Sequence, residues 1–336
     1  MAITVHQDSH SESSASVDKS IPQKNELSET RAEHAGNAEM QAAYDEEQEQ
    51  LWWSRMRENM RDFWSEFFGT MMLILFGDGV VAQVVLSEGA KGEYQSISWG
   101  WGIGVMLGVY VGGKTGGHLN PAVTFCNCLF RGLPWRKFPT YFAGQLLGAM
   151  AGAFVVYGNY RFAIDEFEGG SGIRTMKTAG IFCTYPADFI DTAAMFWSEV
   201  ISSAILMFVI FAMTDKDNIG AGNLLPLCLF FLIFGIGACW GWLTGYAINL
   251  ARDFGPRLVS YIVGYGTQVW SSGNYYFWIP MVAPFVGCTF GAFLYDLFLY
   301  EGESPVNTPW IGLKRLSQPR RSVWSNTYKS KAQSQV

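Results

Sequence analysis

Two asparagines, Asn120 and Asn249, stand where they could donate hydrogen bonds to a solute. Each opens a three-residue box at the start of a short apolar segment, Asn-Pro-Ala at 120–122 and Asn-Leu-Ala at 249–251. An asparagine that caps a helix accepts backbone N–H groups through its oxygen, which leaves its amide nitrogen free to donate. Two helices that meet at their N-termini also place two positive dipole ends together. The pattern predicts hydrogen-bond donors that face a lumen, at a point that repels cations and protons.

Two glutamates precede these boxes at similar distances. Glu66 lies 54 positions before Asn120, and Glu199 lies 50 positions before Asn249, each inside an apolar stretch. A carboxylate at membrane depth is costly unless it is paired or hydrogen-bonded. We expect each one to accept otherwise unpaired N–H groups of the loop that leads to its box.

A third acid, Asp78, also lies within the first apolar stretch. Asp78 stands between two glycines in the sequence Phe-Gly-Asp-Gly at 76–79. Two interpretations remain open: Asp78 is a buried partner for a neighbouring helix, or it faces a lumen.

The elements that must position these residues are strongly apolar. Of 336 residues, 49% are hydrophobic and only 15% are charged, which is too few charges for a soluble surface of this size. A helix that crosses a bilayer needs roughly 20 apolar residues. The sequence predicts six such helices, at about 63–86, 96–113, 138–157, 193–213, 224–243 and 277–300.

Two further apolar segments, 120–130 and 249–262, are too short to cross a bilayer. Irregular backbone at membrane depth survives only where it is buried in protein or lines water, so we expect both to be re-entrant half-helices. Each half of the chain then has three spans, and because three is odd the second half is inverted. The predicted fold class is an all-α membrane protein with six transmembrane helices and two half-helices in an inverted repeat.

The distribution of basic residues predicts the orientation. Lysine and arginine in short loops favour the cytoplasm. They gather before the first span, after the first half-helix and after the sixth span, as Arg55, Arg57, Arg61, Arg131, Arg136, Lys137, Lys314, Arg315, Arg320 and Arg321. An even number of spans puts both ends on one side. We expect a multi-pass protein of the plasma membrane with both termini in the cytoplasm.

The segments around the two boxes resemble those of a known family. Residues 116–124 are Gly-Gly-His-Leu-Asn-Pro-Ala-Val-Thr, and residues 245–256 are Gly-Tyr-Ala-Ile-Asn-Leu-Ala-Arg-Asp-Phe-Gly-Pro. They resemble the twin Asn-Pro-Ala boxes of the aquaporin superfamily, the major intrinsic proteins. The Ala-Arg-Asp-Phe-Gly-Pro run looks like the glycerol-conducting branch, the aquaglyceroporins, of which some fungal-type members have a similar Asn-Leu-Ala box.

This resemblance covers residues 62–300 and implies a channel domain there, with one repeat at about 62–158 and the other at about 191–300. Tails at 1–61 and 301–336 flank it. The first tail is polar and has no signal-peptide core, so we expect it to be disordered and cytoplasmic. The resemblance also implies a homotetramer in a lipid bilayer.

By the same resemblance, Trp99, Gly237, Tyr246 and Arg252 form a selectivity filter. Arg252 would donate to hydroxyls and repel cations, while Trp99 and Tyr246 would form an apolar corner for CH groups. Gly237 would leave room for a carbon chain. Asn120 and Asn249 would be the central donors of the pore, and loop carbonyls at 116–118 and 245–247 would be its acceptors.

The remaining expected site residues are supporting ones. His118 would orient the first loop by a hydrogen bond, together with Glu66 and Glu199 as loop supports. Asp253, Arg257 and Pro280 match the polyol-conducting branch, and their alternative role is the packing of loops.

The predicted function is passive transmembrane diffusion of glycerol, other small uncharged solutes and water, with exclusion of ions and protons. In aquaporin-type pores an arginine and half-helix dipoles are the known barrier to cations. No basic patch indicates nucleic acid, and no residue cluster indicates a metal, a cofactor or an enzyme. An ion-coupled secondary transporter is the alternative, because such proteins also use inverted repeats and broken helices. Leu250, in place of proline, keeps a non-conducting structural relative open.

Overall fold

The computed structural model describes residues 35–37, 40, 51–308 and 310–311. Most of the two predicted tails, 1–61 and 301–336, therefore lies outside the described residues. The part of the first tail that is described differs from the expectation of disorder, because Trp52–Asn59 forms helix α2, a stretch with neither glycine nor proline. The chain divides into two units at Met56, and the unit that begins at Arg57 carries the fold described below.

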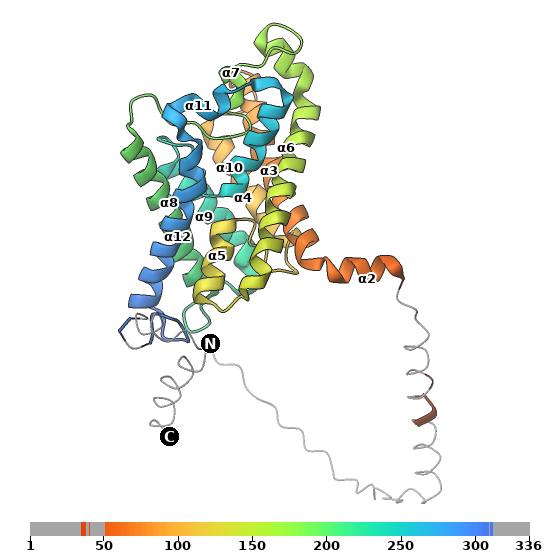
Figure 1. Cartoon of the computed structure of the whole chain (residues 1–336), viewed down its shortest axis with the longest axis vertical. Helices are drawn as coiled ribbons and strands as arrows, with labels where there is room; N and C mark the ends of the chain where they lie inside the picture. Colours follow the sequence, from red (N-terminus) through yellow and green to blue (C-terminus); the bar gives the residue numbers. More distant parts are fainter. Residues whose placement is uncertain (1–34, 38–39, 41–50, 309, 312–336) are drawn as a thin grey trace, which may run out of the picture. The chain divides into compact units, whose positions relative to one another are not determined.

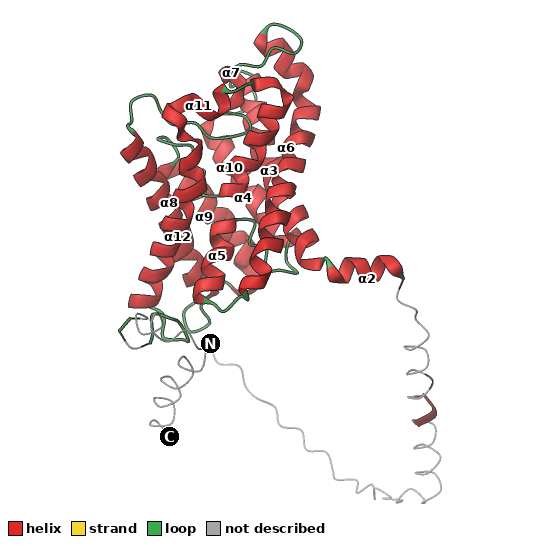
Figure 2. Cartoon of the chain, viewed as in Figure 1, coloured by secondary structure: helices red, strands yellow, loops and turns green. Residues whose placement is uncertain are grey.

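Six long helices form this unit, with two short helices among them (Figures 1 and 2). The long ones are α3 (Arg61–Leu86), α4 (Tyr94–Val111), α6 (Phe138–Glu168), α8 (Thr192–Thr214), α9 (Leu225–Trp240) and α12 (Ile279–Phe298). The short ones, α5 (Pro121–Phe130) and α10 (Leu250–Ser260), match the predicted half-helices. Helices α7 (Met176–Ala179) and α11 (Gln268–Tyr275) lie in connecting segments.

Five helical segments in the described part of the chain are long and apolar enough to cross a membrane. The exception among the six long helices is α4, which has 18 residues but carries Gln95, serines and several glycines that lower its hydropathy. Helix α6 extends well beyond the predicted end at Tyr157 and stops at Gly169, whose φ of 82° is a left-handed conformation suited to glycine.

The packing repeats itself in the two halves of the chain. Helix α3 packs against α4 and α6, and in the same way α8 packs against α9 and α12. Each short helix packs on a long helix of the other half, α5 on α12 and α10 on α6. Figure 1 shows α5 and α10 in opposite halves of the bundle. The inverted repeat therefore brings the starts of α5 and α10 together near its middle.

Close helix contacts depend on glycines in both halves of the chain, of which two are examples. A Cβ atom at Gly148 of α6 would overlap the carbonyl oxygen of Phe67 in α3, and one at Gly291 of α12 would overlap the carbonyl oxygen of Ala204 in α8. Small residues let helix backbones approach closely in a membrane, where there is little hydrophobic driving force between helices.

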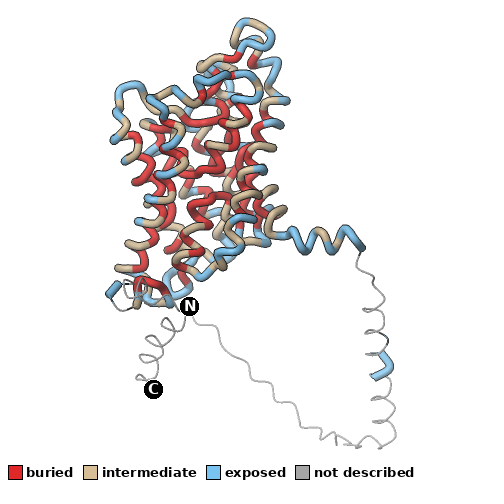
Figure 3. The backbone as a smooth tube through the Cα atoms, viewed as in Figure 1, coloured by how far each residue is buried: buried red, intermediate tan, exposed pale blue. Residues whose placement is uncertain are grey.

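Burial separates the interior of the bundle from its outer surface. Figure 3 shows buried residues along the interior and exposed ones mainly at the periphery and ends. Several large apolar side chains point outward from the long helices, namely Phe68, Phe76, Phe154, Trp197, Phe231 and Phe290. An outer surface of this kind suits a lipid or protein neighbour rather than water.

We predict that Gly291→Val separates α12 from α8 and destabilises the fold by about 2 kcal/mol or more. The measurement is the fraction of detergent-solubilised protein that stays monodisperse on size-exclusion chromatography after heating. The matched control is Gly158→Val, since a Cβ at Gly158 in α6 would meet no atom within 4 Å. Equal loss in both variants would contradict the close-contact argument.

Candidate functional site

A cavity of about 610 Å³ runs between the long helices and is lined by the starts of both half-helices. Its walls include Asn120 and Asn249 from the two boxes, together with the loops at 116–119 and 246–248. Gly245, which was expected to contribute a carbonyl, is not among the lining residues.

Each asparagine of the two boxes ties its own half-helix to the loop of the other half. The Asn120 oxygen accepts from the Ala122 N–H at 2.9 Å, and its Nδ2 donates to the Ile248 carbonyl at 2.8 Å. The Asn249 Nδ2 donates to the Leu119 carbonyl at 2.7 Å. An amide NH₂ group has two hydrogens, so each side chain keeps one further N–H at the cavity wall.

The second half-helix begins with leucine where the first begins with proline. The Asn249 oxygen accepts from two N–H groups, those of Ala251 at 3.0 Å and Arg252 at 3.2 Å. Leu250 itself is buried at the first helical position. The capped start of α10 is thus formed without the preorganised proline ring.

Glu66 holds the first loop from inside the bundle and is fully buried. Its oxygens accept from the backbone N–H groups of His118 at 3.0 Å and Leu119 at 2.9 Å. The Thr115 hydroxyl and the Gln145 amide also donate to it, at 2.5 and 2.7 Å. Four donors around one carboxylate offset much of the cost of burying its charge.

Glu199 does the same for the second loop. Its oxygens accept from the N–H groups of Ala247 at 2.9 Å and Ile248 at 2.8 Å, with the Tyr276 hydroxyl at 3.4 Å. The two carboxylates therefore make equivalent contacts in the two halves of the repeat.

Both loops have unusual backbone conformations just before their asparagines. Leu119 has a φ of +53°, and Tyr246 and Ile248 have φ values of +41° and +43°. Non-glycine residues with positive φ are strained and persist only where their surroundings hold them. The bonds from Glu66 and Glu199 supply that restraint, which keeps the carbonyls of Leu119 and Ile248 directed at the opposite asparagine.

The Arg252 guanidinium lies at the cavity wall, 3.9 Å from the ring centroid of Trp101, and donates to the Phe182 carbonyl at 3.4 Å. None of the ion pairs within the described residues involves Arg252. Its positive charge is therefore not neutralised by a direct carboxylate contact.

The expectation that Trp99 is part of the selectivity filter is wrong, because Trp99 does not line the cavity. Trp99 is 45% exposed on the outer side of α4, with its ring 5.2 Å from that of Phe230 and 4.9 Å from that of Phe234. Trp101, which is 3% exposed, lines the cavity instead. Two residues apart on a helix means about 200° of rotation, so the two tryptophans face opposite ways.

Gly237 and Tyr246 are neighbours, but their relation differs from the one expected. A Cβ at Gly237 would lie 2.9 Å from the phenol oxygen of Tyr246, and Gly237 itself does not line the cavity. The glycine therefore makes room for the Tyr246 ring, and the ring lines the cavity. Tyr94 fixes the same region by donating to the Gly237 carbonyl at 3.0 Å.

Asp253 and Arg257 form a buried ion pair that holds a loop against α10. The Arg257 guanidinium donates to both oxygens of Asp253, at 2.8 and 3.0 Å, and to the carbonyls of Thr184 and Val269. The Thr184 N–H donates to Asp253 at 2.8 Å. This loop also presents the Phe182 carbonyl to Arg252, so the ion pair positions a hydrogen-bond partner of Arg252.

The same loop contains Cys183, which is buried. Burial raises the pKa of its thiol to about 11, so the thiol stays protonated at neutral pH and behaves as a small apolar group.

Two other predicted residues have structural positions near the site. The His118 Nδ1 lies 3.1 Å from the Thr124 hydroxyl, which fixes the imidazole at the cavity wall. Pro280 is buried at the start of α12, in the first turn, where proline is well tolerated.

Asp78 is not among the residues that line the cavity. It is fully buried in α3, and neither carboxylate oxygen has a hydrogen-bond partner among the described residues. The lumen interpretation is thus not supported by its position.

Gln145, which binds Glu66, and the Phe182 loop were not predicted from the sequence, because neither has a local signal that points to its distant partner.

The chain matches the family model described as "Major intrinsic protein" over residues 53–295. It is 67% identical over 332 residues to "Probable aquaglyceroporin-2" of Gibberella zeae, with 98% of each chain covered. It is also 67% identical to "Aquaglyceroporin-9" of Botryotinia fuckeliana, over 79% of this chain and 60% of that protein. The X-ray structure of the aquaglyceroporin from Plasmodium falciparum is similar with a TM-score of 0.63 and 33% identity, over 70% of this chain and 95% of that one.

Replacing Asp78 with valine is expected to raise stability, by about 1–3 kcal/mol, because a buried carboxyl without partners is exchanged for an apolar group. Thermal inactivation of the purified protein in detergent measures the effect. Asp296→Val serves as the contrast, since that buried carboxylate is paired with Arg131 at 2.6 Å and its loss should destabilise. A lower stability of Asp78→Val would show that Asp78 makes a favourable contact.

Proposed function

The chain belongs to the major intrinsic protein family, and we propose that it conducts glycerol, other small uncharged solutes and water through a membrane by passive diffusion. It is a multi-pass membrane channel protein and not an enzyme. The observation that carries the proposal is the crossed pair of amide–carbonyl bonds from Asn120 and Asn249, which leaves one N–H of each at the cavity wall. These two donors would bind the oxygens of water and polyols in turn.

The solute range follows from the residues near Arg252. The rings of Trp101 and Tyr246 line the cavity and offer apolar surface for CH groups. The Arg252 guanidinium, whose carbon lies 3.9 Å from the centroid of the Trp101 ring, offers N–H donors for hydroxyls. A molecule with a hydroxyl on every carbon, such as glycerol, satisfies both surfaces at once. We therefore assign the filter to Trp101, Tyr246 and Arg252, with Gly237 behind Tyr246.

Exclusion of ions follows from the same charges. The Arg252 guanidinium has no ion-pair partner among the described residues, and the N-termini of α5 and α10 meet at the centre. A cation in this low-dielectric passage meets positive charge without a compensating carboxylate. Proton passage is opposed for the same reason.

The short loop that follows α5 supports a cytoplasmic position for the termini. Arg131, Arg136 and Lys137 lie in or beside this loop, and Arg131 binds Asp296 near the end of α12. The basic loop and the end of the sixth long helix are therefore on one side, which we assign to the cytoplasm of the cell, with the plasma membrane as the site. We also propose a homotetramer in the lipid bilayer, which the apolar outward face can support.

The decisive test is stopped-flow light scattering on proteoliposomes under water and glycerol gradients, with Gly237→His as the variant. An imidazole at 237 must enter the space of the Tyr246 ring, so glycerol permeability should fall at least about tenfold while water permeability falls less. The control is Gly235→His on the same helix, where a Cβ meets no atom within 4 Å.

Glycerol uptake by the wild type should need no ion gradient. Uptake that persists only with a proton gradient would favour the coupled transporter, and wild-type vesicles no more permeable than empty ones would favour a non-conducting protein.

A further inference from the structure

The ten residues after α12, 299–308, fold back on the end of that helix, and we call them the strap. The Tyr300 N–H donates to the Tyr295 carbonyl at 3.1 Å, which starts the turn. The Asn307 amide then closes it by donating to the carbonyls of Tyr300 and Gly302, both at 2.8 Å. Ser304 and Val306 are buried. The strap is therefore part of the folded unit.

Arg131, at the end of α5, clamps the strap to the bundle. Its guanidinium donates to both oxygens of Asp296 in α12, at 2.9 and 2.6 Å. The Ser304 hydroxyl donates to the same carboxylate. The guanidinium carbon also lies 4.1 Å from the ring centroid of Tyr300 and 3.7 Å from that of Phe211. A planar guanidinium can stack and form a two-pronged ion pair at the same time, which lysine cannot.

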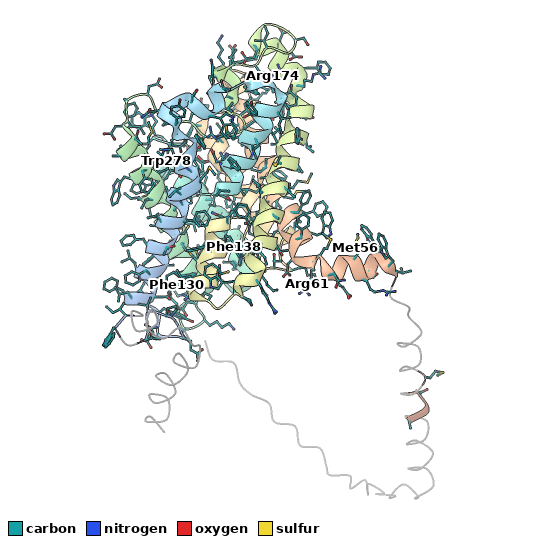
Figure 4. All side chains as sticks on the ribbon, in the orientation of Figure 1. Met56, Arg61, Phe130, Phe138, Arg174 and Trp278 are labelled. Atoms are coloured by element: carbon teal, nitrogen blue, oxygen red, sulfur yellow. The ribbon has the colours of Figure 1, made fainter. Side chains whose placement is uncertain are left out.

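Arg131 and Tyr300 both line the cavity that holds Asn120 and Asn249. They lie at the end of the bundle where α5 and α12 stop. Figure 4 shows Phe130, the residue before Arg131, at the opposite end of the bundle from Arg174. The cavity therefore carries an arginine on an aromatic ring at two places, Arg252 on Trp101 and Arg131 on Tyr300.

The two pairs differ in charge. Asp296 neutralises Arg131 directly, whereas Arg252 has no ion pair within the described chain. The Arg131–Asp296 ion pair therefore acts only weakly on an ion in the cavity. The contribution of this region to the cavity is the volume of the Tyr300 ring. Gly302 lies close against this ring, because a Cβ there would overlap it.

We propose that Arg131 is a positioning residue that holds Tyr300 in the pore mouth, where Tyr300 forms a second, uncharged constriction that limits glycerol more than water. The inference rests on the proposed function of the channel. Ions are then excluded at the Arg252 end of the cavity, whereas solutes are selected by size at both the Arg252 end and the Tyr300 end. Since the strap reaches Arg131 through Asp296 and Ser304, any change in that contact alters the width of the mouth.

The experiment compares glycerol and water permeabilities of proteoliposomes that contain the full chain. Tyr300→Ala should raise glycerol permeability about threefold and change water permeability less. Tyr300→Phe keeps the ring and should match the wild type. Tyr261→Ala removes an exposed ring that does not line the cavity and is the matched control.

The clamp is tested with the paired variant Arg131→Met with Asp296→Asn, which leaves no buried charge unpaired. It should shift the glycerol-to-water ratio in the same direction as Tyr300→Ala, whereas a merely structural role would lower both permeabilities together. Adding Tyr300→Ala to this pair should cause no further rise, because the ring is already released.

If the wild type conducts glycerol and Tyr300→Ala has the same glycerol-to-water permeability ratio, the second constriction is overturned and the proposed function stands. If wild-type and Tyr300→Ala vesicles are both as tight as empty ones, the proposed function and the constriction are both overturned. If wild-type vesicles are tight but Tyr300→Ala vesicles conduct glycerol, the protein has a conducting path that the Tyr300 ring closes, which supports the constriction.

Discussion

The crossed hydrogen bonds between the two half-helices are the interaction on which the rest of the site depends. Asn120 binds the loop of the second half and Asn249 binds the loop of the first, so neither half-helix can be placed without the other. The carbonyls they bind belong to Leu119 and Ile248, which both have positive φ. Such carbonyls stay in place only because Glu66 and Glu199 hold the adjoining N–H groups. The carboxylates, though away from the solute, therefore determine where the donors point.

Much of this arrangement could be predicted because it depends on patterns within short segments of the sequence. Apolar runs of about span length gave the long helices, and the asparagines gave the starts of α5 and α10 within one residue. The similar spacing of Glu66 and Glu199 to their boxes pointed to loops that need an acceptor. These features follow from the cost of leaving backbone N–H groups unpaired in a membrane, and that cost acts on each segment separately.

The errors arose where the outcome depends on rotation or on distant partners. Trp99 and Trp101 are the same residue type two positions apart, and only the phase of α4 decides which one faces the cavity. A resemblance in sequence does not show which of two nearby tryptophans faces the cavity. Arg131 and Asp296 are 165 positions apart, and a basic residue after a half-helix indicates orientation before it indicates a clamp. Likewise, nothing local to Gly237 shows that Tyr246 fills the space beside it.

The charges of the bundle explain why the cavity wall is positively charged at Arg252 although the chain has a formal net charge of −6. Two buried carboxylates form ion pairs, Asp253 with Arg257 and Asp296 with Arg131. Glu66 and Glu199 accept hydrogen bonds from neutral loop N–H groups, and the Asp78 carboxylate has no hydrogen-bond partner among the described residues. Each of the two ion pairs has no net charge, so beyond short range it acts as a dipole and adds little to the field along the cavity. Arg252 is left with a carbonyl and an aromatic ring, neither of which carries a full negative charge. The positive charge at this point therefore persists because none of the ion pairs in the described part of the chain involves Arg252.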